Sequence, residues 1–357
     1  MADSNSNSGT QTIAEILSEP RTWMQCLAQL DETGQLRTLS EELPKKAEWV
    51  FVGCGSSFYL AQIAAATWSI LTRALARAIA ASEILLFPNL LPEACQPVLI
   101  SRSGQTSEVV DVARYCEQKL KIRTLAVTCG VGTPLETSSS HVIRLPMADD
   151  KSTVMTRSFT SMLLALQALA AERAGRQDFL AALRGLSAQV EPQMAEVERT
   201  VRSLVNARGY AGYVFLGQGP FFGVAQESML KVKEMSCSYA QAFHTLEFRH
   251  GPKAIVSDET LVTFFLSESG FDAETAVLEE IKGLGGATLV VTNSANGTVR
   301  RSADFLIELS LEAPEEARPV ANVIAGQFLG FHTAIRKGFD PDQPRHLTRV
   351  VMLDGKS

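Results

Sequence analysis

Short runs of consecutive apolar residues alternate along this chain with longer stretches of helical periodicity. The apolar runs end in Gly, Ser or Thr, and we expect them to form strands at residues 49–52, 98–100, 124–127, 142–145, 213–216, 261–266, 288–291 and 305–309. Continuous apolar strands separated by helices are typical of parallel sheets that helices cover on both faces. The pattern therefore predicts an α/β protein.

The helical patterns divide the strands into two groups. Residues 159–172 and 179–203 look like long connecting helices, and residues 11–43 look like a helical lead-in. We expect a polar tail and lead-in at 1–44, a first domain with the connecting helices at 45–200, a second domain at 201–338 and a tail at 339–357.

The two groups of strands repeat one another at an offset of 164 residues. WVFVGCGSSFYLAQ at 49–62 aligns with YVFLGQGPFFGVAQ at 213–226, and LAVT at 125–128 aligns with LVVT at 289–292. With a shift of two more positions, the match extends from Ser101, Ser103 and Gly104 to Ser267, Ser269 and Gly270. A period this long indicates a duplicated domain.

Composition and charge narrow the functional class. The chain has 357 residues, of which 46% are hydrophobic, and a net charge of −6, which disfavours a nucleic-acid partner. We expect no membrane span, because the most apolar stretches are charged or too short. The six cysteines show no CxxC or zinc spacing, which favours reduced thiols in the cytoplasm, and the histidines show no metal-ligand spacing.

Two loops of the first copy combine glycines with hydroxyls directly after a strand. They are GCGSS at 53–57 and SRSGQT at 101–106. Glycines allow close backbone approach, and free N–H groups at a helix N-terminus attract anions, so together the loops favour phosphate binding. Ordinary turn and N-cap chemistry is the alternative. A nicotinamide dinucleotide is a weaker alternative, because the GxGxxF pattern lacks the third glycine of the dinucleotide motif.

The second copy carries charged residues instead. Glu227, Lys231 and Glu234 share one face of a helix expected over 223–236, where a solvated face with a salt bridge is the alternative. A Gly/Pro-terminated loop at 245–252 contains His250, and an incidental loop histidine is the alternative there.

Several of these segments resemble the sugar isomerase (SIS) domain family. They are GCGSSF at 53–58, SRSGQT at 101–106, MTRSFTSM at 155–162, ESMLKVKEMS at 227–236, EFRHGP at 247–252 and DQPRHLTRVV at 342–351. The similarity is to the double-SIS isomerase half of glucosamine–fructose-6-phosphate aminotransferase and to its stand-alone relatives, and it covers about residues 45–351. It implies two tandem SIS domains, each a flavodoxin-like or Rossmann-like three-layer sandwich.

The resemblance also implies roles for individual residues. The implied phosphate ligands are Ser56, Ser57, Ser101, Arg102, Ser103 and Thr106. The implied contacts with the sugar are Cys54, Gly55, Thr153 and Glu227, with Cys54 structural rather than nucleophilic. The implied catalytic residues are Glu234, His250, Lys231 and Arg349. Glu234 is the implied base that moves a proton between C1 and C2. His250 is the implied ring-opening residue, supplied across a homodimer interface.

Two departures from the family pattern change the expected chemistry. The chain begins MADSN, where the synthase has a glutaminase domain, so we do not expect glutamine-dependent amination. Arg349 stands where the synthase has a lysine that forms an imine with the ketose, and a guanidinium cannot form one.

We therefore expect an isomerase or deaminase acting on a hexose or amino-hexose 6-phosphate, with no cofactor and no metal. The enzymatic alternatives are a transaminase-like enzyme and a fructosamine-6-phosphate deglycase. A non-catalytic sugar-phosphate-binding regulator is the alternative of another class.

Overall fold

The computed structural model describes residues 8–45 and 47–352, which form two compact units, each with its own parallel sheet. Residues 1–7 of the expected polar tail and residues 353–357 of the expected C-terminal tail lie outside the described residues. The first-sheet unit comprises Arg21–Asp150, Met155–Gly185 and residues 348–352. The second-sheet unit comprises residues 8–20, Lys151–Val154 and Leu186–Leu347.

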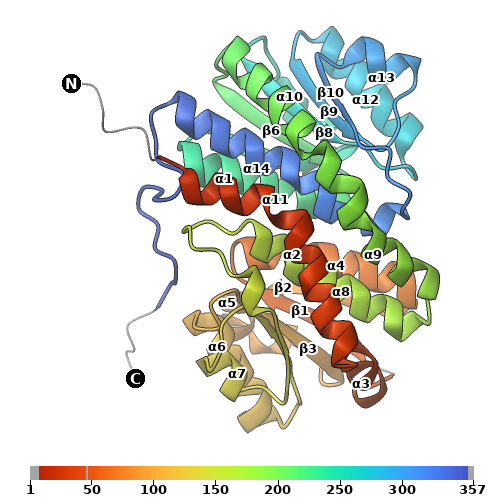
Figure 1. Cartoon of the computed structure of the whole chain (residues 1–357), viewed down its shortest axis with the longest axis vertical. Helices are drawn as coiled ribbons and strands as arrows, with labels where there is room; N and C mark the ends of the chain where they lie inside the picture. The colour runs from red at the N-terminus through yellow and green to blue at the C-terminus, as the bar shows by residue number, and fades with distance from the viewer. Residues whose placement is uncertain (1–7, 46, 353–357) are drawn as a thin grey trace. The chain divides into compact units, whose positions relative to one another are not determined.

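The first sheet has five parallel strands in the order β2-β1-β3-β4-β5 (Figure 1). They are β1 (Glu48–Gly53), β2 (Ala76–Ala80), β3 (Cys95–Ile100), β4 (Leu125–Thr128) and β5 (His141–Arg144). From β1 the chain continues to β2 on one side and later to β3 on the other. The strand order therefore reverses beside β1, which is where ligands bind in open parallel sheets.

Helices cover both faces of this sheet, as the apolar strands require. Trp49 of β1 stacks on Trp68 of α4, whereas Val50 and Val52 of the same strand belong to the cluster that contains Val109 of α6. The helices of the unit are α2 (Glu19–Glu32), α3 (Gln35–Glu42), α4 (Ser56–Thr72), α5 (Ala81–Leu86), α6 (Ser107–Arg114), α7 (Pro134–Thr137), α8 (Arg157–Ala174) and α9 (Gln177–Val190). The boundary between the units runs through α2 and α9.

The second sheet has the equivalent order, β10-β9-β8-β6-β7. Its strands are β6 (Gly212–Gly217), β7 (Ala240–His244), β8 (Thr260–Phe265), β9 (Ala287–Thr292) and β10 (Phe305–Glu308). Its helices are α1 (Thr10–Leu17), α10 (Met194–Ala207), α11 (Pro220–Ser236), α12 (Phe271–Gly283), α13 (Gly297–Ser302) and α14 (Pro319–Arg336). The predicted α/β fold with two parallel sheets is thus confirmed.

The observed helices and strands differ from the predicted ones in two respects. The strands β2 and β7 were not predicted, because both pair on one side only and lack a continuous apolar run. The single helix expected over 179–203 is divided into α9 and α10 by a 3-10 turn at Glu191–Gln193, where Pro192 cannot donate a backbone hydrogen bond.

Two aspartates from residues 339–347 hold the start of α1. Asp342 accepts hydrogen bonds from the backbone N–H groups of Gln11 and Thr12 at 3.0 and 2.7 Å, and Asp340 accepts one from Gly9 at 2.9 Å. Carboxylates are favourable at this position, because the first N–H groups of a helix have no partner within the helix. Further along α1, the buried Glu15 accepts the backbone N–H of residue 152 at 3.3 Å.

Candidate functional site

The first hydroxyl loop leaves β1 through a tight turn that only glycine allows. A Cβ on Gly53 would lie 2.5 Å from the carbonyl carbon of Ser57, and Gly55 has a positive φ of 55°. The turn starts the 17-residue helix α4 at Ser56, so Ser56 and Ser57 lie in its first turn, where they are 6% and 5% exposed. Two hydroxyls therefore lie together in the first turn at a helix N-terminus.

The second hydroxyl loop, between β3 and α6, gathers three hydroxyls. Ser101 Oγ lies 3.1 Å from Thr106 Oγ1 and 3.5 Å from Ser103 Oγ, and it accepts the N–H of Gly104 at 3.2 Å. A Cβ on Gly104 would meet Thr133 Oγ1 at 2.2 Å, so the loop backbone needs glycine here. We call the loops 53–57 and 101–106 together the hydroxyl cradle.

The sheet brings the two loops of the cradle together. The strands β1 and β3 are parallel neighbours, with Val52 paired to Leu99, so the loops leave the same edge of the sheet side by side. This edge is the point where the strand order reverses. Two helix N-termini and a group of hydroxyls thus meet at the place where the fold favours an anionic ligand.

Arg102, an expected phosphate contact, has partners within the first-sheet unit. Its side chain is 5% exposed, and its Nη2 donates to the backbone carbonyl of Arg349 at 2.8 Å. Burial raises the pKa of Asp150, which is completely buried, while the charge of Arg102 and hydrogen bonds from Ser158 and Thr156 oppose that rise. The guanidinium is therefore engaged with the C-terminal segment and with the charge of Asp150.

The C-terminal segment lies over the second loop of the cradle. Arg349 forms an ion pair with Asp149 at 2.5 Å and also donates to the carbonyl of Asp150. The N–H of Ser107, at the start of α6, donates to the carbonyl of Val351 at 3.4 Å. Arg349 thus fastens this segment beside the cradle, and its side chain remains 46% exposed.

Cys54 lies within the cradle, and an unpredicted carboxylate, Glu108, lies beside it. Burial, followed by the charge of Glu108, raises the pKa of Cys54 to about 11, so the thiol is protonated at neutral pH. This agrees with a structural role. Glu108, in the first turn of α6, has a buried Oε2 with no hydrogen-bond partner among the described residues. An acid in a first turn is so common in sequences that it gave no signal of a special role.

The charged residues of α11 form a buried triad. Lys231 Nζ lies 3.2 Å from Glu227 and 2.6 Å from Glu234, and the three side chains are 0%, 0% and 20% exposed in the order Lys231, Glu227, Glu234. The alternative of a solvated face is therefore wrong for Glu227 and Lys231. Burial lowers the pKa of Lys231, but the charges of its two carboxylate partners outweigh burial and raise it overall. Lys231 is thus a protonated cation between two acids.

Two glycines of α14 allow that helix to approach the triad closely. A Cβ on Gly330 would lie 2.8 Å from the backbone of Lys231, and one on Gly326 would lie 2.0 Å from Ser228 Oγ. The helix α14 therefore packs directly on the backbone of α11, which fixes the position of the triad. The sequence pattern GxxxG at 326–330 is the signal that could have identified this packing.

His250 and Thr153 lie on loops of the second-sheet unit. His250 follows a 3-10 turn at Glu247–Arg249, is exposed, and makes no hydrogen bond to Glu234 in the described structure. Thr153 donates its N–H to the carbonyl of Asp342 at 3.4 Å. Within the described residues, His250 therefore has no direct hydrogen bond to the triad.

The loop of the second sheet that aligns with 101–104 is occupied by the chain itself. The carboxylate of Glu315 accepts the backbone N–H groups of Glu268 at 2.7 Å and Ser269 at 3.1 Å, together with the hydroxyl of Ser269. Glu274 accepts the N–H and hydroxyl of Ser267 at 3.0 and 2.6 Å. This loop binds anionic oxygens, but the oxygens are internal.

Two kinds of structural element are absent from the described residues. No helix among them is both long and apolar enough to cross a membrane. Nor do they contain a group of three or more His, Cys, Asp or Glu side chains placed to hold a metal ion.

Comparison with known proteins identifies both sheets. The SIS domain model matches residues 42–172 and 213–334. The chain is 27% identical, over 356 residues, to glutamine–fructose-6-phosphate aminotransferase [isomerizing] of Pyrobaculum aerophilum, and the match covers 96% of this chain and 57% of that protein. The enzyme of the same name from Brucella melitensis is also 27% identical, with 95% and 58% covered. The chain thus spans little more than half the length of these relatives.

Two of the solved structures with full-length similarity are phosphosugar enzymes by name. Glucosamine-6-phosphate deaminase of Thermotoga maritima has a TM-score of 0.81 and 28% identity, covering 96% of this chain and all of that one. Tagatose-6-phosphate ketose/aldose isomerase of Escherichia coli has a TM-score of 0.85 and 23% identity, covering 98% and 97%. The second similarity concerns the fold alone.

Proposed function

Because this chain belongs to the SIS domain family, we propose that it is a phosphosugar isomerase or deaminase acting on a hexose or amino-hexose 6-phosphate. The observation that carries the proposal is the hydroxyl cradle at the reversal point of the first sheet. The similarity to the Thermotoga maritima deaminase, which spans both units, supports an amino-sugar phosphate as the first substrate to test.

The second sheet supplies an internal template for phosphate binding by the cradle. There, the anionic oxygens of Glu315 take two backbone N–H groups and one serine hydroxyl of the Ser-x-Ser-Gly loop. In this proposal the phosphate takes the aligned donors of the first sheet, which are the N–H groups of Arg102 and Ser103 and the Ser103 hydroxyl. Ser57, Ser101 and Thr106 add further hydroxyl donors, and Arg102 contributes through its backbone rather than its guanidinium.

Glu234 is the proposed base. Isomerisation and deamination both begin with an open-chain sugar and a proton transfer next to its carbonyl or imine carbon, which needs a carboxylate that can accept and return the proton. Glu234 is the partly exposed member of the triad, and Lys231 holds it by a 2.6 Å hydrogen bond. Glu227, completely buried on the other side of Lys231, keeps the ammonium group in place. A cation beside the reacting carbons also stabilises the enediolate that forms.

His250 is the proposed ring-opening residue, supplied by a second copy of the chain. Its exposure on a loop and its lack of contact with Glu234 support a role across an interface, and the homodimer is part of the proposal. Glu108 is a proposed contact for a sugar hydroxyl, because its unpartnered oxygen is beside Cys54 on the cradle. Thr153 remains a proposed sugar contact. The cytoplasm is the proposed compartment, since all six cysteines are free and four are buried.

No covalent imine with the tail is part of the mechanism. A guanidinium does not form an imine as a lysine amine does, and the Arg349 side chain pairs with Asp149, so it fastens the C-terminal segment. Borohydride treatment in the presence of fructose 6-phosphate should therefore leave no sugar adduct on residues 340–357. A trapped adduct there would contradict this assignment.

The proposal is tested by turnover on a panel of hexose and hexosamine 6-phosphates, with ammonia release and ketose–aldose exchange as separate readouts. We expect ammonia release from a 2-amino-2-deoxyhexose 6-phosphate, or interconversion of a ketose and an aldose 6-phosphate, in either case without added glutamine. Turnover that requires glutamine would favour the transaminase-like alternative, and cleavage of a fructosamine 6-phosphate would favour the deglycase. Tight binding of a phosphosugar without any turnover would favour the regulator.

A further inference from the structure

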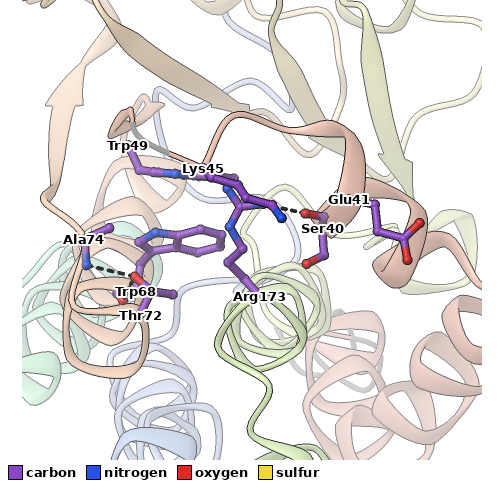
Figure 2. A pocket seen from close by; sticks show the side chains of 8 residues that line it. All are labelled: Ser40, Glu41, Lys45, Trp49, Trp68, Thr72, Ala74 and Arg173. Atoms are coloured by element: carbon purple, nitrogen blue, oxygen red, sulfur yellow. Dashed lines mark hydrogen bonds between the residues drawn. The ribbon is translucent and has the colours of Figure 1, made fainter.

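Cations fasten a loop in each of the two units, and the loops differ in what they carry. In the first-sheet unit, Arg173 lines a pocket of about 400 Å³ and donates to three backbone carbonyls of residues 40–44 (Figure 2). In the second-sheet unit, Arg249 and Lys253 belong to the loop that carries His250, and both bind a carboxylate outside it. Only this second loop holds a residue that the proposed function uses.

Two 3-10 turns make up the loop at 247–255, which we call the histidine loop. The first turn, Glu247–Arg249, ends immediately before His250, and the second, Pro252–Ile255, begins after Gly251. Gly251 has a φ of 123°, which glycine adopts readily and other residues do not. Because a glycine bends easily, the direction of the His250 side chain depends on what holds the two flanking turns.

The first turn is anchored in the core of the second-sheet unit. Phe248 is completely buried and belongs to the hydrophobic cluster that contains Val277 and Ile281 of α12. Its ring centroid lies 5.3 Å from that of Phe243 in β7. The second turn, Pro252–Ile255, has no buried residue and therefore needs another anchor.

One carboxylate of α12 connects the two turns. Glu280 accepts a hydrogen bond from Nε of Arg249 at 2.9 Å through Oε2 and binds the ammonium group of Lys253 through Oε1. Arg249 immediately precedes His250, and Lys253 lies in the turn that follows it, so the carboxylate holds both sides of the histidine. Hydrogen bonds from Lys253 and Arg249 lower the pKa of Glu280, which keeps it ionised at neutral pH.

The exposure of this cluster indicates what it does. The side chains of Glu280, Arg249 and Lys253 are 30%, 35% and 38% exposed, and ion pairs at such positions contribute little to global stability. They are suited instead to fixing the geometry of a surface loop. Geometry matters for a catalytic group, because a misplacement of about 1 Å can lower a rate about 10²-fold.

We propose that Glu280 is a positioning residue for His250. By holding Arg249 and Lys253 together, it fixes the direction in which the histidine loop presents the exposed imidazole. The inference rests on the proposed function, in which His250 opens the sugar ring in a second copy of the chain. It deepens that function by naming a residue outside both the loop and the cradle on which ring opening depends.

The test compares a sugar that must be opened with one that is always open. Fructose 6-phosphate closes its ring through the 5-hydroxyl. In 5-deoxyfructose 6-phosphate that hydroxyl is absent and the 6-oxygen carries the phosphate, so no five- or six-membered ring can form. The full chain is assayed for conversion of each ketose to the aldose or, with ammonia, to the amino sugar. Glu280→Gln is the test variant, and the exposed neighbour Glu279→Gln is the matched control.

We expect Glu280→Gln to lower kcat on fructose 6-phosphate about 3- to 30-fold, a part of the roughly 10²–10⁴-fold that an acid or base contributes. The kcat on the open-chain ketose and the KM for both should change little, because the cradle holds the phosphate. Glu280→Asp, which keeps the charge, should recover part of the lost rate. Glu279→Gln should behave as the wild type.

A double substitution shows whether Glu280 acts through His250. In a His250→Ala background, Glu280→Gln should cause no further loss, because a residue that acts only through His250 then has nothing to position. This comparison uses whichever phosphosugar the wild type turns over. Additive losses would overturn the inference, and so would equal losses on the two ketoses.

Amide hydrogen exchange gives a readout that needs no turnover. The N–H groups of the histidine loop should exchange faster in Glu280→Gln than in Glu279→Gln, while those of the buried strand β8 stay unchanged. Unchanged exchange in the loop would also overturn the inference. If the wild type turned over no phosphosugar, the proposed function would fail, whereas hydrogen exchange would still decide whether Glu280 anchors the loop.

Discussion

The two Ser-x-Ser-Gly loops share one backbone-to-hydroxyl hydrogen bond but differ in what binds to them. In each loop the glycine N–H donates to the first serine hydroxyl, at 3.2 Å for Gly104 and 2.9 Å for Gly270. In the second sheet, Glu315 fills the donors of the loop, whereas the aligned donors of the first sheet lie beside the cradle hydroxyls. This shared hydrogen bond alone therefore does not make a binding site. What distinguishes the first loop is that, among the described residues, no carboxylate is hydrogen-bonded to Ser103, the counterpart of Ser269.

The glycine turns after β1 and β6 also share a conformation but differ in their polar side chains. Gly55 and Gly219 have nearly identical backbone angles, with φ 55° and ψ −128° in one and φ 52° and ψ −128° in the other. The serines that follow in the first turn are replaced by proline and phenylalanine in the second. The two copies thus share the turn, but only the first carries hydroxyls in it.

The helices that follow these turns show the opposite distribution, because only the helix of the second copy carries the charged triad. At the offset of 164, the triad of α11 aligns with Ile63, Thr67 and Ile70 of α4. The first copy therefore has the proposed anion-binding loops without the acids, and the second copy has the acids, while its Ser-x-Ser-Gly loop binds Glu315. The predictions below test this division, from the largest expected effect to the smallest.

The largest effect should come from Glu234→Gln. This substitution keeps the shape of the side chain but removes the base, so turnover should fall about 10²–10⁴-fold. Phosphosugar affinity should survive, because the acids of the second copy do not hold the phosphate. Steady-state kinetics and calorimetry measure the two effects, with the exposed Glu279→Gln as control. Wild-type turnover in Glu234→Gln would show that the base lies elsewhere.

The next largest effect should be a loss of phosphosugar affinity when the cradle hydroxyls are removed. Replacing Ser101 and Ser103 together by alanine should weaken phosphosugar binding about tenfold or more, since each charge-assisted hydrogen bond contributes about 1.5–3 kcal/mol. The matched change in the other copy, Ser269→Ala, should leave the affinity unchanged. Calorimetric titration of both variants decides the point, and equal losses would abolish the distinction between the loops.

The two glycine turns should separate stability from binding. Gly53→Ala and Gly217→Ala each force a Cβ against the backbone of the next helix, at 2.5 and 2.2 Å, and should each lower the free energy of unfolding by about 1–3 kcal/mol. Only Gly53→Ala should also weaken phosphosugar binding. Urea unfolding and titration of the folded variants test this, and an unaffected affinity in Gly53→Ala would remove the first loop from the site.

The smallest effect should come from Glu315→Gln. The amide removes the charge that accepts two N–H groups and a hydroxyl, so the free energy of unfolding should fall by about 1 kcal/mol. The affinity of the cradle for phosphosugar should not change. Urea unfolding at neutral pH checks the first statement, and an unaltered midpoint would mean that Glu315 does not stabilise the loop.

The strands were predictable from the sequence where they are buried on both faces. Continuous apolar runs identify β1 or β8, because every residue of such a strand contacts a helix layer. The edge strands β2 and β7 were missed because their sequences mix polar and apolar positions to suit a half-exposed place. The positions of the cradle serines followed from the turn chemistry and the repeat.

The occupancy of the loops was not predictable, because it depends on contacts between distant residues. Ser269 matches Ser103 in the alignment, and only the structure shows that Glu315, 46 positions later, binds to it. Arg102 similarly looks like a phosphate ligand in the sequence, but its partner is the carbonyl of Arg349, 247 positions away. The local sequence pattern indicates the conformation of a loop but not which distant groups bind to it.

The aspartates that hold α1 have a consequence for biosynthesis. The helix α1 is synthesised before its partners Asp340 and Asp342, which follow about 330 residues later. Domains generally fold as they are synthesised, and nearly all of the first-sheet unit precedes the strands of the second. The helix α1 therefore lacks its capping partners until residues 340–342 have been made, so its docking follows the synthesis of both sheets.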